Sequence, residues 1–251
     1  MIWDSADARR VEELLLNATQ PAQQLQYDGW LLRLAPNDVK RASSINPING
    51  SSLPIEEKIA HCERVYAEHG LPPLYRMTPL AQPASLDEAL EGRGYVSFER
   101  NVSMTAPLDQ ALPRTRADLH FERPDLDGWM RVAAEIRGLT PERQEAERRR
   151  LFESTLPGFA VVAYAGDGAV GCGLMMIEDD YAGLFDLATV TPQRRRGIGL
   201  ATCVYLMQLA RQHGAARAWL SVVADNEAAV RLYERLGFAP VYDYWYRAKP
   251  A

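Results

Sequence analysis

TVTPQRRRGIGLATCVYLMQLARQHG (Thr189–Gly214) combines an apolar helical pattern with three consecutive arginines. The apolar spacing predicts a helix that begins near Gly197 or Gly199 and ends at the last glycine of the segment. A helix start offers unpartnered N–H groups and the positive end of the dipole, so each exposed cation there costs about 0.3–1 kcal/mol. Arg194–Arg196 therefore indicate a bound anion such as a phosphate, and a solvated surface turn is the alternative.

The composition limits the function classes that fit this chain. It has 251 residues, is 47% hydrophobic and carries a formal net charge of -5, which argues against a general nucleic-acid binder. The three cysteines form no CxxC pair and have no histidine at ligand spacing, so neither a disulfide framework nor a metal site is expected. The sequence has no long apolar run and no signal-peptide pattern, which favours a cytoplasmic protein without a membrane partner.

A proline-interrupted segment, 105–118, divides the sequence and reads as a linker. Downstream, periodicity and turn residues predict a mixed α/β domain with a large sheet. Its expected elements, in chain order, are a short strand at 119–124, helices at 125–138 and 140–155, three strands within 158–190, the arginine-led helix, a strand at 216–225, a helix at 226–237 and a strand at 240–248.

The first half of the sequence repeats the order of the second. CERVYAEHG ends in His69-Gly70 as LMQLARQHG ends in His213-Gly214, and each is followed by a strand, a helix and a strand pattern. This order suggests a duplicated unit, with chance similarity between two α/β segments as the alternative. The first copy has Pro83 and Leu90 where the second has Asn226 and Tyr233, and it lacks the glycine-arginine loop. The first half is therefore expected to be a scaffold.

Two motifs carry a family resemblance. Arg194–Gly199 reads R-x-x-G-x-G after a strand, and Asn226–Phe238 reads N-x-x-A-x-x-L-Y-x-x-x-G-F. Together they resemble the GNAT superfamily of acyl-CoA N-acyltransferases. The resemblance implies a mixed central sheet flanked by helices, in a tandem arrangement with a degenerate first copy. It also implies a degenerate GNAT-like domain at 1–110, a linker at 111–117 and a catalytic domain at 118–251.

The resemblance implies acetyl-CoA as the acyl donor and no metal. Backbone N–H groups of the arginine loop would hold the pyrophosphate, and the end of the preceding strand would pair with the pantetheine arm. The N–H of Thr189 is our choice to polarise the thioester carbonyl. Because Pro192 comes one residue late, a shift of one residue in this strand is left open. The expected cofactor-binding residues are Leu187, Ala188, Thr189, Arg194, Arg195, Arg196, Gly197, Ile198, Gly199, Leu200, Ala201, Asn226 and Tyr233.

Two residues of the second motif match functional positions of the family. Asn226 would contact the pantetheine arm, and a helix N-cap is an alternative or additional role for it. Tyr233 would protonate the leaving thiolate, for which a phenol with a pKa near 10 is suited. The alternative for Tyr233 is a core aromatic with a satisfied hydroxyl.

The general base is not decided by the sequence. Asp186 lies in an otherwise apolar strand beside the expected thioester position, where a carboxylate is either catalytic or held by a structural partner. Glu178 ends the neighbouring strand, where a solvated hairpin turn is the alternative. Asp186 is slightly favoured.

These observations predict an N-acetyltransferase (EC 2.3.1.-) in which a primary amine attacks the thioester directly. The acceptor is a small molecule or a peptide, nucleic acid is not a partner, and the protein is a monomer or homodimer. The rival hypotheses are a non-catalytic acyl-CoA sensor or partner-binding pseudoenzyme, and an arginine site for nucleic acid or an acidic partner. The tyrosines of VYDYWYRA either line an acceptor pocket or pack as ordinary strand residues.

Overall fold

The computed structural model describes residues 5–35, 39–116, 118–152 and 154–250. They form two compact units, and the chain passes from one to the other after Ser103, Leu220, Asn226 and Ala239. Unit 1 holds the chain up to Ser103, residues 221–226 and the residues from 240 onward, and unit 2 holds the rest. The division by contacts thus differs from the linear division at 111–117 that the sequence suggested, because the C-terminal strand belongs to unit 1.

The expected linker is shorter than its proline content indicated. Strand β5 (Val96–Pro107) includes Thr105, so the regular structure ends at the first proline of the segment rather than before it. Residues 111–116 form neither helix nor strand, and Ala117 lies outside the described residues.

Unit 1 is built on a sheet in which β1, β2, β3, β4 and β11 are successive neighbours. β3 and β4 are parallel, whereas the other pairs in this set are antiparallel. Residues Val96–Ser103 of β5 also belong to this unit. The remaining elements are α1 (Ser5–Ala18), β1 (Gln23–Tyr27), β2 (Trp30–Leu34), the 3-10 turn η1 (Lys40–Ala42), β3 (Ile45–Asn46), α2 (Ile55–Glu68), β4 (Leu74–Met77), α3 (Leu86–Gly92) and β11 (Ala239–Ala248).

The three tyrosines of β11 pack inside unit 1. Tyr242, Tyr244 and Tyr246 are each at most 2% exposed, and Trp245 on the opposite face donates its Nε1–H to Asp87 Oδ1 at 3.0 Å. This alternation is the period-two strand pattern expected from the sequence. The tyrosines therefore form part of a packed and hydrogen-bonded interior.

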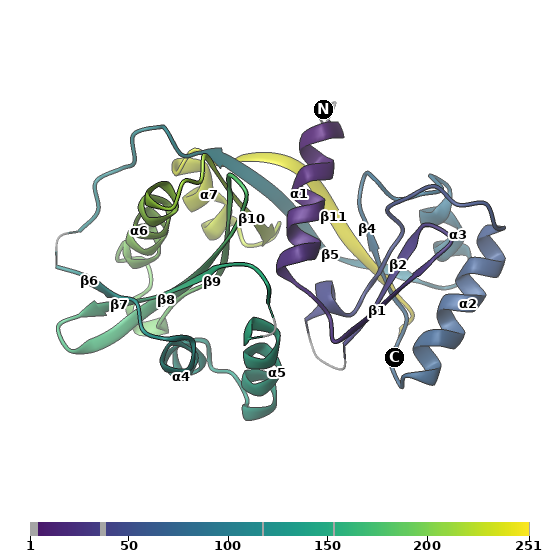
Figure 1. Ribbon diagram of the computed structural model, residues 1–251, viewed down its shortest axis with the longest axis horizontal. Coiled ribbons are helices and arrows are strands. Elements are labelled where there is room, and N and C mark those ends of the chain that lie inside the picture. The colour runs from purple at the N-terminus through teal and green to yellow at the C-terminus, as the bar shows by residue number, and fades with distance from the viewer. Residues whose placement is uncertain (1–4, 36–38, 117, 153, 251) are drawn as a thin grey trace. The chain divides into compact units, whose positions relative to one another are not determined.

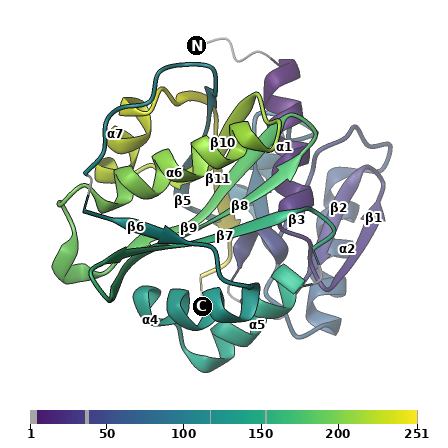
Figure 2. The same cartoon turned by 60° about the vertical axis from the view of Figure 1, so that its left-hand side comes forward.

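Unit 2 contains the sheet order β10, β9, β8, β7, β6, in which only β9 and β10 are parallel. Helices α4 and α5 lie on one face of these strands and α6 lies on the other (Figures 1 and 2). The elements are β6 (His120–Glu122), α4 (Leu126–Arg137), α5 (Pro141–Phe152), β7 (Gly158–Ala165), β8 (Gly168–Glu178), β9 (Tyr181–Thr189), η2 (Thr191–Gln193), α6 (Ile198–Gln212), β10 (Arg217–Val223) and α7 (Glu227–Arg235). Apart from η2, each of these elements lies where the sequence predicted a helix or a strand.

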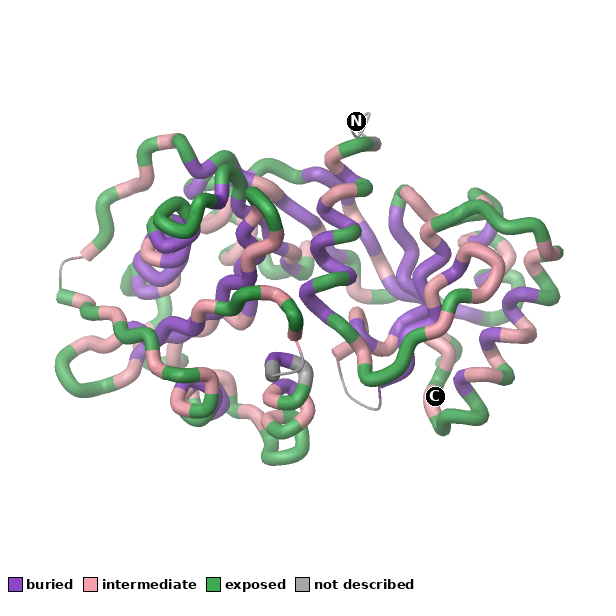
Figure 3. Tube along the Cα trace, viewed as in Figure 1, coloured by how far each residue is buried: buried purple, intermediate pink, exposed green. Residues whose placement is uncertain are grey.

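Glycines in β8 allow α6 to lie close to the sheet. A Cβ atom on Gly173 would come within 2.9 Å of Leu206 Cδ1 in α6, and one on Gly171 would come equally close to Ile198 Cγ2. Nine of the fifteen residues of α6 are buried as a result, and Figure 3 shows this burial along the helix and the central strands. The tight contact fixes the start of α6 relative to the end of β9.

The two halves of the chain share an order of elements. α2, β4, α3 and β5 follow one another as α6, β10, α7 and β11 do. This is the helix-strand-helix-strand repeat noted in the sequence, now seen as formed elements.

Helix α4 provides a test of local stability. Asp125 caps it, with its carboxylate Oδ1 accepting the N–H of Gly128 at 2.7 Å. We expect Asp125→Ala to lower the free energy of unfolding by about 1 kcal/mol, because one N–H of the first turn loses its acceptor. Urea denaturation measures the change. Asp125→Asn, which keeps an acceptor oxygen, is the matched control; equal losses in both variants would contradict the capping role.

None of the helices in the described segments has the length and apolar character needed to cross a bilayer. The same segments contain no group of three or more His, Cys, Asp or Glu side chains placed to hold a metal ion. All three cysteines are buried free thiols.

Candidate active site

The parallel strands β9 and β10 are paired only at their beginnings. The register joins Tyr181–Gly183 to Arg217–Trp219 and does not continue beyond them in the described chain. From Leu184 onward, the edge of β9 on the β10 side is therefore open for pairing with another extended group. This is the geometry expected of a strand that receives the pantetheine arm.

A β-bulge reshapes the open part of β9. Phe185 pairs with Leu174 and Ala188 with Cys172, so Asp186 and Leu187 together oppose a single residue of β8. Asp186 has a φ of 52°, in the left-handed region. The extra residue bends the strand and adds one residue to β9 relative to β8 between Phe185 and Ala188.

The bulge determines which N–H groups point to the open edge. The N–H of Val190 donates to Val170 O on β8 at 3.0 Å. Because successive N–H groups of a regular strand point to opposite sides, the N–H of Thr189 points away from β8. It is placed to donate to a carbonyl lying along the open edge of β9.

The loop between β9 and α6 presents a run of free backbone donors. In the described structure, no acceptor is found for the six N–H groups of 195–200. Ala201 differs from our expectation, because its N–H already donates to Gly197 O at 3.0 Å. Arg195 and Gly197 have φ values of 63° and 80°, which turn the chain so that these donors gather at the start of the helix.

The three arginines surround this loop. All are exposed, and within the described residues no carboxylate lies within 4.0 Å of any of them. Arg194 Nε donates to Thr189 O at 3.4 Å, and Arg196 Nη1 donates to Gln193 Oε1 at 2.6 Å. The loop thus combines six free N–H groups, a helix dipole and uncompensated cations, which together suit a pyrophosphate.

A cavity of about 120 Å³ lies between the end of β9 and helices α6 and α7. Five of the expected site residues line it: Leu187, Ala188, Thr189, Gly199 and Tyr233. Its other lining residues are Cys172, Thr202, Cys203, Ala229 and Leu232.

The other expected residues lie around or away from this cavity. Ile198 and Ala201 are buried, so only their backbone can face a ligand. Asn226 directly precedes α7, and its own N–H donates to Val223 O at 3.0 Å. Arg194–Gly197 and Leu200 form the loop and the first turn described above.

Tyr233 lies at the α7 side of the cavity and is half-buried. Burial raises the pKa of its phenol well above the ordinary value, and the nearby Cys203 thiol adds to this effect. The hydroxyl therefore remains protonated at physiological pH and is able to donate a proton.

Asp186 has a structural partner. Its Oδ1 lies 3.0 Å from Arg137 Nη2 at the end of α4, and Arg137 also contacts both carboxylate oxygens of Glu147, at 2.5 and 3.0 Å. Glu147 is 2% exposed although it belongs to α5, a helix composed mostly of charged residues. The ion pair fixes the Asp186 carboxylate beside the bulge.

Glu178 lies far from the cavity. It pairs with Tyr181 at the β8–β9 hairpin, and Leu187 is six residues further along β9, or about 20 Å at the usual strand rise. The structure therefore does not bring Glu178 to the open edge of β9.

The sequence did not identify Arg137 of α4 as the partner of Asp186, or Glu147 of α5 as the second partner of Arg137. It also did not indicate that Cys172 and Cys203 line the cavity. Burial raises the pKa of Cys172 and of Cys203 to about 12, so both are neutral thiols. The only sequence signal for Arg137 and Glu147 was opposite charge, which is common on helices and does not identify a partner.

Comparison with known proteins identifies the family. Residues 5–247 match the family described as "Probable histone acetyltransferase Rv0428c C-terminal". The chain belongs to this family. Its fold agrees, because a GCN5-related N-acetyltransferase from Kribbella flavida superimposes with a TM-score of 0.74 at 21% identity, over 97% of this chain and 95% of that one. This member of the Rv0428c family is therefore an acyltransferase with the GNAT fold.

Two curated relatives extend the comparison. The uncharacterized N-acetyltransferase YobR of Bacillus subtilis is 28% identical over 248 residues, which are 97% of this chain and 99% of YobR. The ribosomal protein bS18-alanine N-acetyltransferase of Escherichia coli K12 is 42% identical over 59 residues, which are 24% of this chain and 40% of that enzyme. The similarity to YobR thus spans both units, whereas the similarity to the bS18 enzyme is confined to a short segment.

Proposed function

We propose that the protein is an acetyl-CoA-dependent N-acetyltransferase that transfers the acetyl group to a primary amine by direct attack on the thioester. The observation that carries this proposal is the continuous path formed by the six free N–H groups of 195–200 and the open edge of β9. A diphosphate fits the six N–H groups, and an extended arm that contains amide groups fits the open edge of β9. The cavity beyond them takes the thioester end.

The donor is held mainly by backbone atoms. The N–H groups of the arginine loop donate to the pyrophosphate, and Arg194 and Arg196 add charge-assisted hydrogen bonds. The edge of β9 at Leu187–Thr189 pairs with the pantetheine arm, and Asn226 contacts it from the start of α7. The N–H of Thr189 donates to the thioester carbonyl and stabilises the oxyanion formed on attack.

The chemical step requires that one proton is removed from the acceptor amine and that one is supplied to the departing thiolate. The amine nitrogen forms a bond to the carbonyl carbon and loses a proton to the base, and the carbon-sulfur bond then breaks. Tyr233 gives its phenolic proton to the departing thiolate, whose own pKa is near that of a free thiol. Asp186, beside the bulge and fixed by Arg137, is the proposed base, acting directly or through one water.

The acceptor class rests on the relatives. The bS18 enzyme acts, by its name, on an alanine of a ribosomal protein, and the family description names histones. Both are amine-bearing proteins, which supports a small-molecule or peptide amine as the acceptor here. We further propose that 118–251 supplies the catalytic residues and 1–110 is a degenerate copy, because the element order repeats while Pro83 and Leu90 replace Asn226 and Tyr233.

Calorimetric titration with acetyl-CoA tests the donor site. We expect the double variant Arg194→Ala/Arg196→Ala to bind about tenfold more weakly, because two exposed charge-assisted contacts are lost while the backbone donors remain. Arg148→Ala/Arg149→Ala, which removes two exposed arginines from α5 of the same unit, is the control and should bind normally.

Two results would contradict the proposal. Absence of acetyl-CoA binding by the folded protein would overturn the donor assignment. Tight binding with no acetyl transfer to any amine in a broad screen would instead support the acyl-CoA sensor.

The base has a separate test. We expect Asp186→Asn to lower kcat at neutral pH by at least about tenfold, within the usual range for general base catalysis. The loss should shrink as the pH rises through the pKa of the acceptor amine, because the amine then reaches the site already deprotonated. A pH–rate profile with saturating acetyl-CoA measures this. A loss that is the same at every pH would show a structural role, and Asp127→Asn, which removes another arginine-paired carboxylate, is the control.

A further inference from the structure

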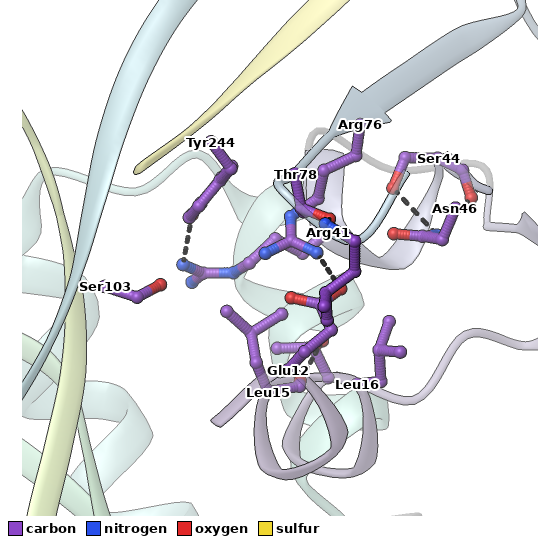
Figure 4. Close-up of polar contacts among 12 residues, drawn as sticks. Glu12, Leu15, Leu16, Arg41, Ser44, Asn46, Arg76, Thr78, Ser103 and Tyr244 are labelled. Atoms are coloured by element: carbon purple, nitrogen blue, oxygen red, sulfur yellow. Dashed lines mark hydrogen bonds and ion pairs between the residues drawn. The ribbon is translucent and has the colours of Figure 1, made fainter. Parts of the chain in front are cut away.

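Unit 1 contains a cluster of arginines that acetyl transfer does not explain. Arg33 and Arg76 are 1% and 0% exposed, and Arg41 is half-buried beside them. Glu12, itself 2% exposed, lies near Arg41 and Arg76 (Figure 4). These three arginines are here called the arginine cluster, and among the described residues only the carboxylate of Glu12 forms an ion pair with them.

Arg33 has a structural role. Its two Nη groups donate to the backbone carbonyls of Leu16, Thr19 and Arg41, at 2.5–2.9 Å. These bonds fasten the end of α1 and the 3-10 turn η1 to strand β2. These bonds account for both Nη groups of Arg33, whereas its buried Nε has no hydrogen-bond partner among the described residues.

Arg76 is only partly satisfied. Its Nη1 pairs with Glu12, whose other oxygen accepts the hydroxyl of Tyr242 at 2.6 Å. The Nε and Nη2 groups of Arg76 are buried, and neither has a hydrogen-bond partner within the described part of the chain. Leaving a buried donor unsatisfied costs about 1–3 kcal/mol, and more for a charged group, so native structures contain few of them.

The two unsatisfied groups lie on the same edge of the planar guanidinium. This edge presents two parallel N–H bonds, the arrangement that binds a carboxylate or phosphate in bidentate fashion. The guanidinium carbon lies 4.0 Å from the centre of the Tyr244 ring, which fixes the plane in place. The edge is therefore preorganised for an oxyanion.

Arg41 contacts the same tyrosine. Its Nη1 donates to the Tyr244 hydroxyl at 3.4 Å, and among the described residues no carboxylate lies within 4.0 Å of it. Figure 4 shows Arg41, Arg76 and Tyr244 converging, with Ser103 to one side. Arg41 is half-buried as a residue, whereas Arg76 beside it is fully buried.

We propose that Arg41 and the free edge of Arg76 bind the oxyanion group of a small ligand, a carboxylate or a phosphate, in unit 1. Water would satisfy the hydrogen bonds of Arg76 but would not offset the charge of Arg41, for which the described residues supply no carboxylate within 4.0 Å. A bound oxyanion does both. The site is separate in its residues from the arginine loop of α6, and it does not depend on the proposed function.

The test must distinguish this site from the α6 loop, where the backbone donors remain even without the arginines. It uses the full chain carrying Arg194→Ala/Arg196→Ala, which weakens anion binding at that loop, and titrates it by calorimetry with inorganic phosphate, with succinate, and with the neutral analogue succinamide. Binding is assigned to unit 1 only where it is lost in the Arg41→Gln protein. We expect saturable binding of phosphate or succinate and none of succinamide, and the preferred anion identifies the ligand class. Adding Arg41→Gln should weaken binding at least about tenfold, by loss of a charge-assisted contact. Arg100→Gln, an exposed arginine of unit 1, is the control.

A second variant, Arg76→Lys, shows whether a loss of anion binding occurs in a protein that is still folded. Arg76→Lys keeps the charge beside Glu12 but has no bidentate edge, so it should weaken anion binding in a chain whose thermal unfolding shows that it is folded. Absence of saturable anion binding, or equal binding by the Arg41→Gln protein, would overturn the proposal. Acetyl-CoA binding by the protein with intact Arg194 and Arg196 tests the proposed function separately, so the two failures are distinguishable.

Discussion

Replacing Tyr233 by Phe is expected to lower kcat by about 10²- to 10³-fold, the usual contribution of a positioned general acid, while the dissociation constant for acetyl-CoA stays nearly unchanged. The ring packs against Phe238, with centroids 5.9 Å apart, and phenylalanine preserves this contact. Only the proton for the leaving thiolate is lost. Steady-state kinetics with calorimetry separates the two quantities.

The pH dependence sharpens this expectation. Burial raises the pKa of the Tyr233 phenol above its ordinary value of about 10, so the acid form persists throughout the range in which an acceptor amine becomes deprotonated. The rate of the native enzyme should therefore rise with pH and show no loss from Tyr233 ionisation below pH 10. If Tyr233→Phe and the native enzyme have the same kcat, Tyr233 is not the general acid and serves only in packing.

Gly197→Ala is expected to weaken acetyl-CoA binding by about 10- to 100-fold. A Cβ atom at Gly197 meets no protein atom within 4 Å, but it would stand where the pyrophosphate approaches the N–H groups of the loop. Each charge-assisted hydrogen bond that is lengthened costs on the order of 1.5–3 kcal/mol. Calorimetric titration with acetyl-CoA gives the change directly.

Gly214 provides a matched control at the other end of the same helix. Its φ is 86°, against 80° for Gly197, and a Cβ there also meets nothing within 4 Å. Alanine at either position is strained by the positive φ, so both variants should lose similar stability. Only the Gly197 variant should lose affinity. If both variants bind acetyl-CoA with equal affinity, this loop does not bind the pyrophosphate.

The sequence could predict the parts of the site that are local in the chain. The start of α6, the end of β9 and Tyr233 were expected from motifs whose residues lie close together or at helical spacing, and Leu187–Thr189, Gly199 and Tyr233 do line one cavity. Their catalytic and binding roles stay predictions, because geometry alone does not assign them.

What could not be predicted depends on distant contacts. Arg137 and Asp186 are far apart in sequence, and nothing in either segment selects the other from many possible charge pairs. The bulge at Asp186 has no sequence signal either, because the residues on both sides of it remain apolar as in any buried strand. The place of β11 in unit 1 is a property of sheet order, which local periodicity does not contain.

The final strand has a consequence for any attempt to dissect this enzyme. β11 follows directly from the helix that carries Tyr233, yet it is hydrogen-bonded to β4 in the other unit. A fragment cut at the expected linker would keep Asp186 and Tyr233 but leave Trp245–Ala248 of β11 without their partners in β4. Expression of 118–251 alone would therefore expose the edge of β11 that β4 covers in the full chain.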